Sequence, residues 1–194
     1  MPKFTEQEKE RIKEKLLLEG EKLFASAGLR KITIDNLSKA AGISHSAFYT
    51  FYESKEQLFM EINMRNKAAI YKRLDVMLAE KSQLSPKELA KCYILFLRKE
   101  LFSDPIILSL DNSLIEYISR RVSPELIQNN ALIDQDAIEK LTKAGVRLRY
   151  SNKYTVKATQ AVFVGISCLD ADEDQEAVIE ILVDALVEKL TLAD

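Results

Sequence analysis

Signals for the start of a helix recur along the whole chain, and they constrain its fold more than any other feature. Capping boxes begin at Thr5 and Ser54, and Ser-Pro or Asp-Pro pairs stand at Ser85, Asp104 and Ser123. Five glycines and four prolines among 194 residues are few for a β-sandwich or barrel, whose many turns need them. The sequence therefore predicts an all-α fold of nine or ten helices with no strand.

Apolar residues at helical spacing follow these signals and place the expected helices along the chain. The first three helices are expected at about Thr5–Gly28, at Thr33–Ala41 and from Ser44. Later helices are expected at 54–78, from Ser85, from Asp104, from Ser123, at about 134–144, at 155–169 and at 174–192. Residues 146–153 are expected to connect two of them.

Composition limits the class of protein. Cys92 and Cys168 lie far apart, with no CxxC pair, so we expect neither a disulfide scaffold nor a metal site. No apolar run reaches the roughly 18 residues that span a bilayer, and residues 1–10 lack the apolar core of a signal peptide. We therefore expect a cytoplasmic protein with no membrane association and no cofactor.

The segment from Thr33 to Lys55 has the pattern of a helix-turn-helix, TIDNLSKAAGISHSAFYTFYESK. Gly42 supplies the backbone freedom of the tight turn, and Ser44 can cap the second helix. Phe48 is expected to face the core, which leaves the polar side chains of the second helix on its outer side. In a helix-turn-helix, the first residues of that helix reach base edges in the major groove.

From about Ile12 to Ile62, the chain resembles the DNA-binding domain of the tetracycline-repressor (TetR) family. The matching residues are spread over fifty positions: Leu23-Phe24, Ala27-Gly28, Thr33, Leu37, Ala41-Gly42-Ile43-Ser44, Phe48-Tyr49, Phe51-Tyr52, Ser54-Lys55-Glu56 and Leu58. The resemblance implies a three-helix DNA-binding domain at residues 1–53. It also implies a helical ligand-binding and dimerisation domain at residues 54–194.

The resemblance also implies roles for single residues. Thr33, Tyr49 and Lys55 stand where the family contacts phosphate, and Ser44, His45, Ser46 and Thr50 stand where it contacts bases or phosphates. Each has a plainer reading, because Thr33 and Ser44 can be simple caps and Tyr49, Lys55 and His45 can be ordinary surface or half-buried residues. Asp35 departs from a position that is often basic in the family, and Gly20 from one that is usually Ala.

The larger domain offers weaker candidates. Five aromatic and thiol residues can line a ligand cavity or simply form core: Cys92, Tyr93, Phe96, Tyr117 and Phe163. Small and apolar residues of the last two helices can form a dimer interface or intramolecular core: Ala158, Ala161, Gly165, Cys168, Ile179, Leu182, Val183 and Leu186. The interface is the expected role, because the resembled family dimerises through its last long helices.

Three functions remain to be compared. The first is a homodimeric repressor that leaves double-stranded operator DNA when it binds an effector, which is expected to be apolar or aromatic. The second is an activator or architectural protein that uses the same DNA-binding module without an effector. The third is an enzyme, which no motif supports, since the single histidine, His45, has no nucleophile or metal-ligand partner at motif spacing. We therefore expect no catalytic residue.

Overall fold

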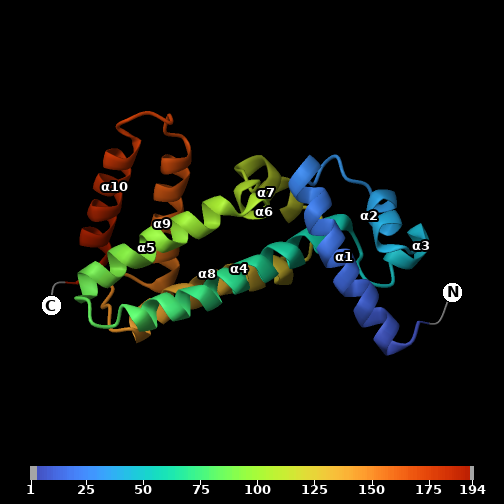
Figure 1. Ribbon diagram of the computed structural model, residues 1–194, viewed down its shortest axis with the longest axis horizontal. Coiled ribbons are helices and arrows are strands. Elements are labelled where there is room, and N and C mark those ends of the chain that lie inside the picture. The colour runs from blue at the N-terminus through green and yellow to red at the C-terminus, as the bar shows by residue number, and fades with distance from the viewer. Residues whose placement is uncertain (1–3, 193–194) are drawn as a thin grey trace. The chain divides into compact units, whose positions relative to one another are not determined.

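The computed structural model describes residues 4–192 and contains ten helices and no strand within them (Figure 1). In chain order the helices are α1 (Glu6–Ala27), α2 (Ile34–Ala41), α3 (His45–Phe48), α4 (Lys55–Glu80), α5 (Pro86–Ser103), α6 (Pro105–Leu108), α7 (Asn112–Ser119), α8 (Pro124–Lys143), α9 (Asn152–Ser167) and α10 (Gln175–Leu190). Leu148 and Thr191 form one isolated antiparallel bridge. The predicted all-α class is confirmed.

One expected helix start was wrong, and one helix was not expected. No new helix begins at Asp134, because α8 runs without a break from Pro124 to Lys143. The carboxylate of Asp134 accepts a hydrogen bond from the Tyr71 hydroxyl at 2.8 Å instead of capping a helix. A separate helix, α7, was missed, although the Asp111 side chain caps it by accepting from the amide of Leu114 at 2.6 Å.

The helices form two compact units. The first comprises the described chain up to Lys67 together with Phe102–Asn130, and the second comprises Ala68–Leu101 together with the described chain from Ala131. Helices α4, α5 and α8 each contribute to both units. Segment 102–130, which carries α6 and α7, therefore belongs to the same unit as the predicted helix-turn-helix.

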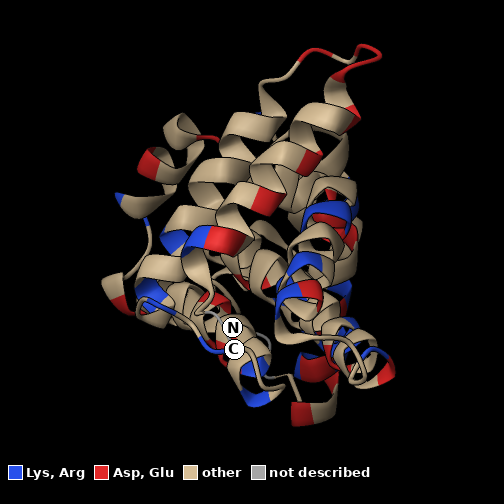
Figure 2. Cartoon of the chain, turned by 90° about the vertical axis from the view of Figure 1, so that its left-hand side faces the viewer, with Lys and Arg blue, Asp and Glu red and all other residues tan. Residues whose placement is uncertain are grey.

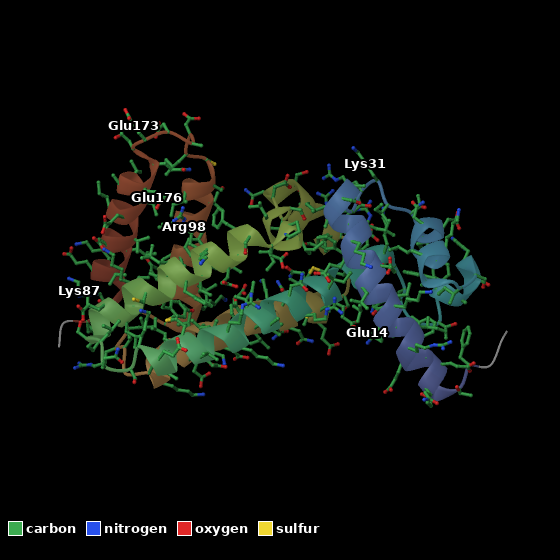
Figure 3. The ribbon with its side chains drawn as sticks, viewed as in Figure 1. Glu14, Lys31, Lys87, Arg98, Glu173 and Glu176 are labelled. Carbon is green, nitrogen blue, oxygen red and sulfur yellow. The ribbon has the colours of Figure 1, made fainter. Side chains whose placement is uncertain are left out.

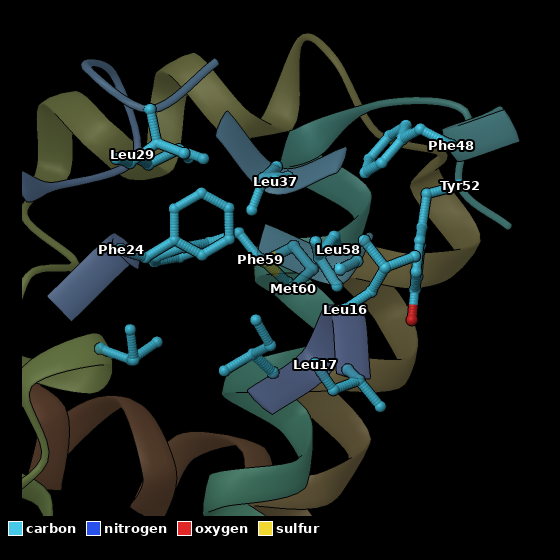
Figure 4. Packing of buried hydrophobic residues seen from close by; sticks show 14 of the residues in the cluster. Leu16, Leu17, Phe24, Leu29, Leu37, Phe48, Tyr52, Leu58, Phe59 and Met60 are labelled. Atoms are coloured by element: carbon cyan, nitrogen blue, oxygen red, sulfur yellow. The ribbon is translucent and has the colours of Figure 1, made fainter. Parts of the chain in front are cut away.

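The first unit is built on one hydrophobic cluster (Figure 4). Phe24 of α1 and Phe59 of α4 meet edge to face with their ring centroids 5.4 Å apart. Ile106 and Ile118 join the cluster from α6 and α7. A Cβ on Gly20 would lie 3.2 Å from side-chain atoms of both Leu58 and Ile62, so glycine allows α1 to approach α4 closely. The unusual glycine thus has a packing role.

Ion pairs fasten helices within each unit. In the first, the Arg65 guanidinium of α4 bonds Glu21 at 2.7 Å and Glu14 at 3.3 Å, both on α1. Glu14 is labelled in Figure 3. In the second, Arg98 of α5 pairs with Glu176 of α10 at 3.1 Å (Figure 3). Helices α9 and α10 of that unit lie side by side (Figure 1).

Candidate nucleic-acid interface

Helices α2 and α3 are joined by a tight turn. Gly42 has φ 74° and ψ 33°, the left-handed region in which glycine is favoured. The amide of the next residue, Ile43, donates to the Ser38 carbonyl at 2.9 Å. The Ser44 hydroxyl then accepts from the amide of Ala47 at 3.2 Å and caps α3. These local bonds set the angle at which α3 leaves α2.

Helix α3 has a buried side and an exposed side. Phe48 is fully buried, and Ala47 is also buried. Four polar residues are exposed on and just after this helix: His45, Ser46, Tyr49 and Thr50. The Tyr49 side chain is half exposed, at 51%, although it is a large aromatic group. The polar edge of α3 therefore faces solvent, as a helix that reads DNA requires.

Thr33 caps the start of α2. Its hydroxyl accepts from the amide of Asn36 at 3.2 Å, and the Asn36 side-chain oxygen accepts in return from the Thr33 amide at 3.0 Å and hydroxyl at 2.8 Å. The cap predicted for Thr33 is thus present. A phosphate at Thr33 would compete with the Asn36 side chain for the Thr33 amide and hydroxyl donors. The first amides of α2 are further donors, because the first amides of any α-helix have no partner within the helix.

The comparisons with known proteins agree with this geometry. Residues 16–62 match the bacterial regulatory proteins of the tetR family. No curated protein sequence matches the chain. The fold is similar to that of a TetR family transcription regulator from Marinobacter aquaeolei, with 13% identity, a TM-score of 0.57, and coverage of 97% of this chain and 100% of that one. It is also similar to the fatty acid degradation regulator FadR from Bacillus halodurans, with 12% identity, a TM-score of 0.59, and coverage of 96% and 97%.

Residues 16–62 belong to the tetR family of bacterial regulatory proteins. The family match spans α2, the turn at Gly42 and α3, which is the part of the chain whose polar edge is exposed. This segment is a DNA-binding helix-turn-helix. Within the described residues, no helix is long and apolar enough to cross a membrane.

Within this segment, Lys55 does not extend into solvent. Its Nζ donates to the carbonyl oxygens of Leu29 at 2.8 Å, Arg30 at 3.2 Å and Ile32 at 2.6 Å. Burial is the main cause that lowers the pKa of Lys55, and Arg121 adds to it. Because an ammonium has three N–H donors and all three are used, the phosphate contact predicted for Lys55 has no donor left in this conformation.

A group of side chains beside Lys55 was not foreseen. Glu56 is 5% exposed, and its carboxylate accepts from the Tyr117 hydroxyl at 2.8 Å. That hydrogen bond is the main cause that raises the pKa of Tyr117. The guanidinium carbons of Arg121 and Arg30 lie 3.8 Å and 5.3 Å from the centroid of the Tyr117 ring. No local pattern reveals this group, because Glu56 and Tyr117 stand far apart in the sequence.

The predicted ligand-pocket residues belong to two different units. Tyr93 and Phe163 are buried and Cys92 and Phe96 half-buried in the second unit. Tyr117 belongs to the first unit, so a ligand pocket that includes Tyr117 stays a prediction. A cavity of about 10 Å³ in the second unit is lined by Ala90, Tyr93, Ile94, Ile138, Leu141, Leu148, Thr155, Thr159, Val187, Leu190 and Thr191.

The predicted dimer residues divide by exposure. Ala161, Gly165 and Cys168 are exposed, and Ala158 and Leu182 are half-buried. Three others are buried within the second unit itself: Ile179, Val183 and Leu186. These three pack inside the protomer and offer little surface to another copy, so their part in a dimer interface stays a prediction. Three large hydrophobic residues of α9 and α10 are exposed: Tyr154, Val164 and Ile181.

The loop between α9 and α10 is acidic. It carries Asp170, Asp172, Glu173 and Asp174, and it is the red loop at the top of Figure 2. Among the residues that the structure describes, no group of three or more His, Cys, Asp and Glu side chains is arranged to hold a metal ion. Phosphate is repelled by such a loop, so this end of the second unit is not a candidate for DNA contact.

Proposed function

We propose that this regulator is a repressor that binds double-stranded operator DNA as a homodimer and leaves it when an effector binds. The observation that carries the DNA-binding mode is the outward polar edge of α3, with Phe48 anchored beneath it. His45, Ser46 and Thr50 contact bases or phosphates, and Tyr49 and Thr33 contact phosphate. Ser44 adds a contact at the N-terminus of α3.

The dimer forms through α9 and α10. Val164 is 59% exposed and Ile181 67% exposed, and Ala161 and Gly165 beside them are small enough to let helices approach closely. Two protomers joined in this way bind a near-palindromic site if their α3 helices enter major grooves about 34–36 Å apart. Repression takes place in the cytoplasm, where the DNA of a bacterial cell lies.

The effector enters the second unit. Its core is apolar, but the hydroxyls of Tyr93 and Thr155 are buried without a hydrogen-bond partner. Such a core suits an apolar or aromatic molecule that carries a polar group able to satisfy one of them. Since a cavity of about 10 Å³ holds no more than about one water, the effector has to open the core as it binds. DNA binding resides in residues 1–53 and effector binding and dimerisation in residues 54–194.

A second function has one observation in its favour. An activator or architectural protein that uses no effector needs no ligand cavity, and the small volume of this cavity fits such a protein. Thermal stability measured against a panel of apolar and aromatic compounds separates the two functions. A compound that raises the melting temperature and weakens DNA binding supports the repressor. Stabilisation by none of them favours the alternative.

The DNA-binding proposal is tested by selection of duplexes from a random-sequence pool. We expect the enriched duplexes to share a near-palindrome, and we expect two protomers to bind each one. The stoichiometry follows from sedimentation of the complex. Enrichment without a shared sequence would contradict sequence-specific recognition, and one protomer per duplex would contradict the dimer.

A further inference from the structure

The segment between α1 and α2 is held by a side chain that follows it by more than twenty residues. The Lys55 Nζ donates to three of its carbonyl oxygens, those of Leu29, Arg30 and Ile32, at 2.6–3.2 Å. Carbonyls at the end of a helix and in the turn after it need donors, and a cation is the strongest one available. The Lys55 side chain therefore holds the backbone of residues 29–32 in one conformation.

Buried apolar side chains also hold the same segment in place. The side chains of Leu29 and Ile32 are 2% and 6% exposed, and both belong to the hydrophobic cluster of the first unit. Thr33 follows directly and caps α2. The position of the α2 start therefore depends on a turn that is held by two buried side chains and by one ammonium group.

Helix α7 braces this turn from a third direction. The Arg30 guanidinium donates to the Ser113 hydroxyl at 2.6 Å and to the Ser113 carbonyl at 3.3 Å. The ring of Tyr117, one turn further along α7, lies under Arg30, and its hydroxyl donates to Glu56. Glu56 is the neighbour of Lys55 in the sequence. Helix α7 therefore contacts both the turn at residues 29–32 and the start of α4.

We infer that Lys55 is a positioning residue, which holds the turn before α2 so that Thr33 and the first amides of α2 meet the DNA backbone. It does not itself contact phosphate, and Tyr117 supports it through Glu56. This inference rests on the proposed DNA-binding function. A direct phosphate contact and a positioning role predict different salt dependences, because only a cation that touches phosphate releases a counterion.

The test uses the full-length protein and a duplex selected by the wild type from a random-sequence pool. Lys55→Met keeps the length of the side chain and removes its donors. We expect about tenfold weaker binding, the size of one charge-assisted hydrogen bond, with an unchanged slope of log affinity against log salt. Lys72→Met, on the exposed side of α4, is the matched control and should bind as the wild type does.

A double-mutant cycle with Thr33→Ala tests the route of the effect. If Lys55 acts through the start of α2, Lys55→Met should cost little further affinity in the Thr33→Ala background. Two results would overturn the inference: a slope that falls by about 0.9, as for one lost phosphate contact, or a full additive loss in the double variant. Wild-type affinity in the folded Lys55→Met protein would overturn it as well.

Tyr117→Phe keeps the inference testable if Lys55→Met does not fold. This variant changes no charge and removes only the hydroxyl that Glu56 accepts from. We expect about threefold weaker DNA binding with an unchanged salt slope, as for a fraction of one hydrogen bond. Wild-type affinity would overturn the inference. If the wild type itself selects no duplex, the proposed function fails instead, so the two failures are distinguishable.

Discussion

The carboxylate of Asp35 on α2 lies 3.9 Å from Nε2 of His45 on α3, and both side chains are more than half exposed. An acidic and a basic residue thus share the surface that is proposed to face DNA. Since the phosphate backbone is anionic, Asp35 weakens every complex in which this surface contacts DNA.

Asp35→Asn should therefore strengthen DNA binding. Removing one exposed negative charge near phosphate is worth up to about 1 kcal/mol at low salt, or about fivefold in affinity, and less at high salt. Titrations of a selected duplex at several salt concentrations measure the change. Asp136→Asn, an exposed acid of α8, is the control and should leave affinity unchanged. Equal effects of the two variants would mean that only net charge matters.

Tyr49→Phe should weaken DNA binding about fivefold, the effect of losing one hydrogen bond to phosphate. Because the Tyr49 side chain is 51% exposed, its hydroxyl is not part of the core and the stability of the fold should not change. Tyr150→Phe provides a matched control, since Tyr150 is also exposed, at 43%, but lies outside the helix-turn-helix. Anisotropy titrations and thermal melts of both variants give the answer. Wild-type affinity in Tyr49→Phe would remove this residue from the interface.

Gly42→Ala should destabilise the fold by about 1 kcal/mol, because a Cβ disfavours the left-handed backbone at this turn. The new Cβ would also lie 3.3 Å from the Lys15 ammonium nitrogen. Urea unfolding measures the change. An unchanged midpoint in Gly42→Ala would contradict the conformation of the turn.

Ile181→Glu should weaken the proposed dimer by about 30-fold or more, since it places a charge at an exposed apolar position of α10. Val76→Glu, at a position of α4 that is 58% exposed, tests whether any exposed Glu has this effect. Sedimentation equilibrium gives both dissociation constants. Ile179→Ala should act differently, destabilising the protomer by about 3 kcal/mol because Ile179 is buried. An Ile181→Glu protein that still dimerises would contradict the assignment of this face.

Two buried tyrosines of the second unit should respond in opposite ways to loss of the hydroxyl. Tyr93→Phe removes a buried hydroxyl without a partner and should stabilise the fold by about 1 kcal/mol. Tyr71→Phe removes a donor to Asp134 at 2.8 Å and should destabilise it by about 1 kcal/mol or more. Urea unfolding of the two variants, each the control for the other, measures the difference. The same sign in both would contradict this hydrogen bonding.

Features set by neighbouring residues could be predicted from the sequence. The caps at Thr5, Thr33 and Ser44 and the turn at Gly42 each depend on residues within four positions, and all are present. The inward side of α3 followed from the spacing of its apolar residues.

Features set by tertiary contacts could not be predicted. Asp134 was expected to begin a helix because acidic residues are common at helix starts. It instead accepts a hydrogen bond from Tyr71, which lies on another helix. The surface lysine Lys55 proved to be bound by carbonyls more than twenty positions earlier. For α10, the spacing of apolar residues placed Ile179 and Val183 on one face of the helix. This spacing does not say whether that face packs against the same protomer or against another copy.

The central claim is that the exposed edge of α3 touches DNA. Backbone amide chemical shifts of the full-length protein, measured without and with a selected duplex, test it most directly. We expect the largest changes between Ser44 and Thr50 and at the start of α2, with little change in the acidic loop between α9 and α10. Unchanged amides from Ser44 to Thr50 in a saturated complex would contradict the claim.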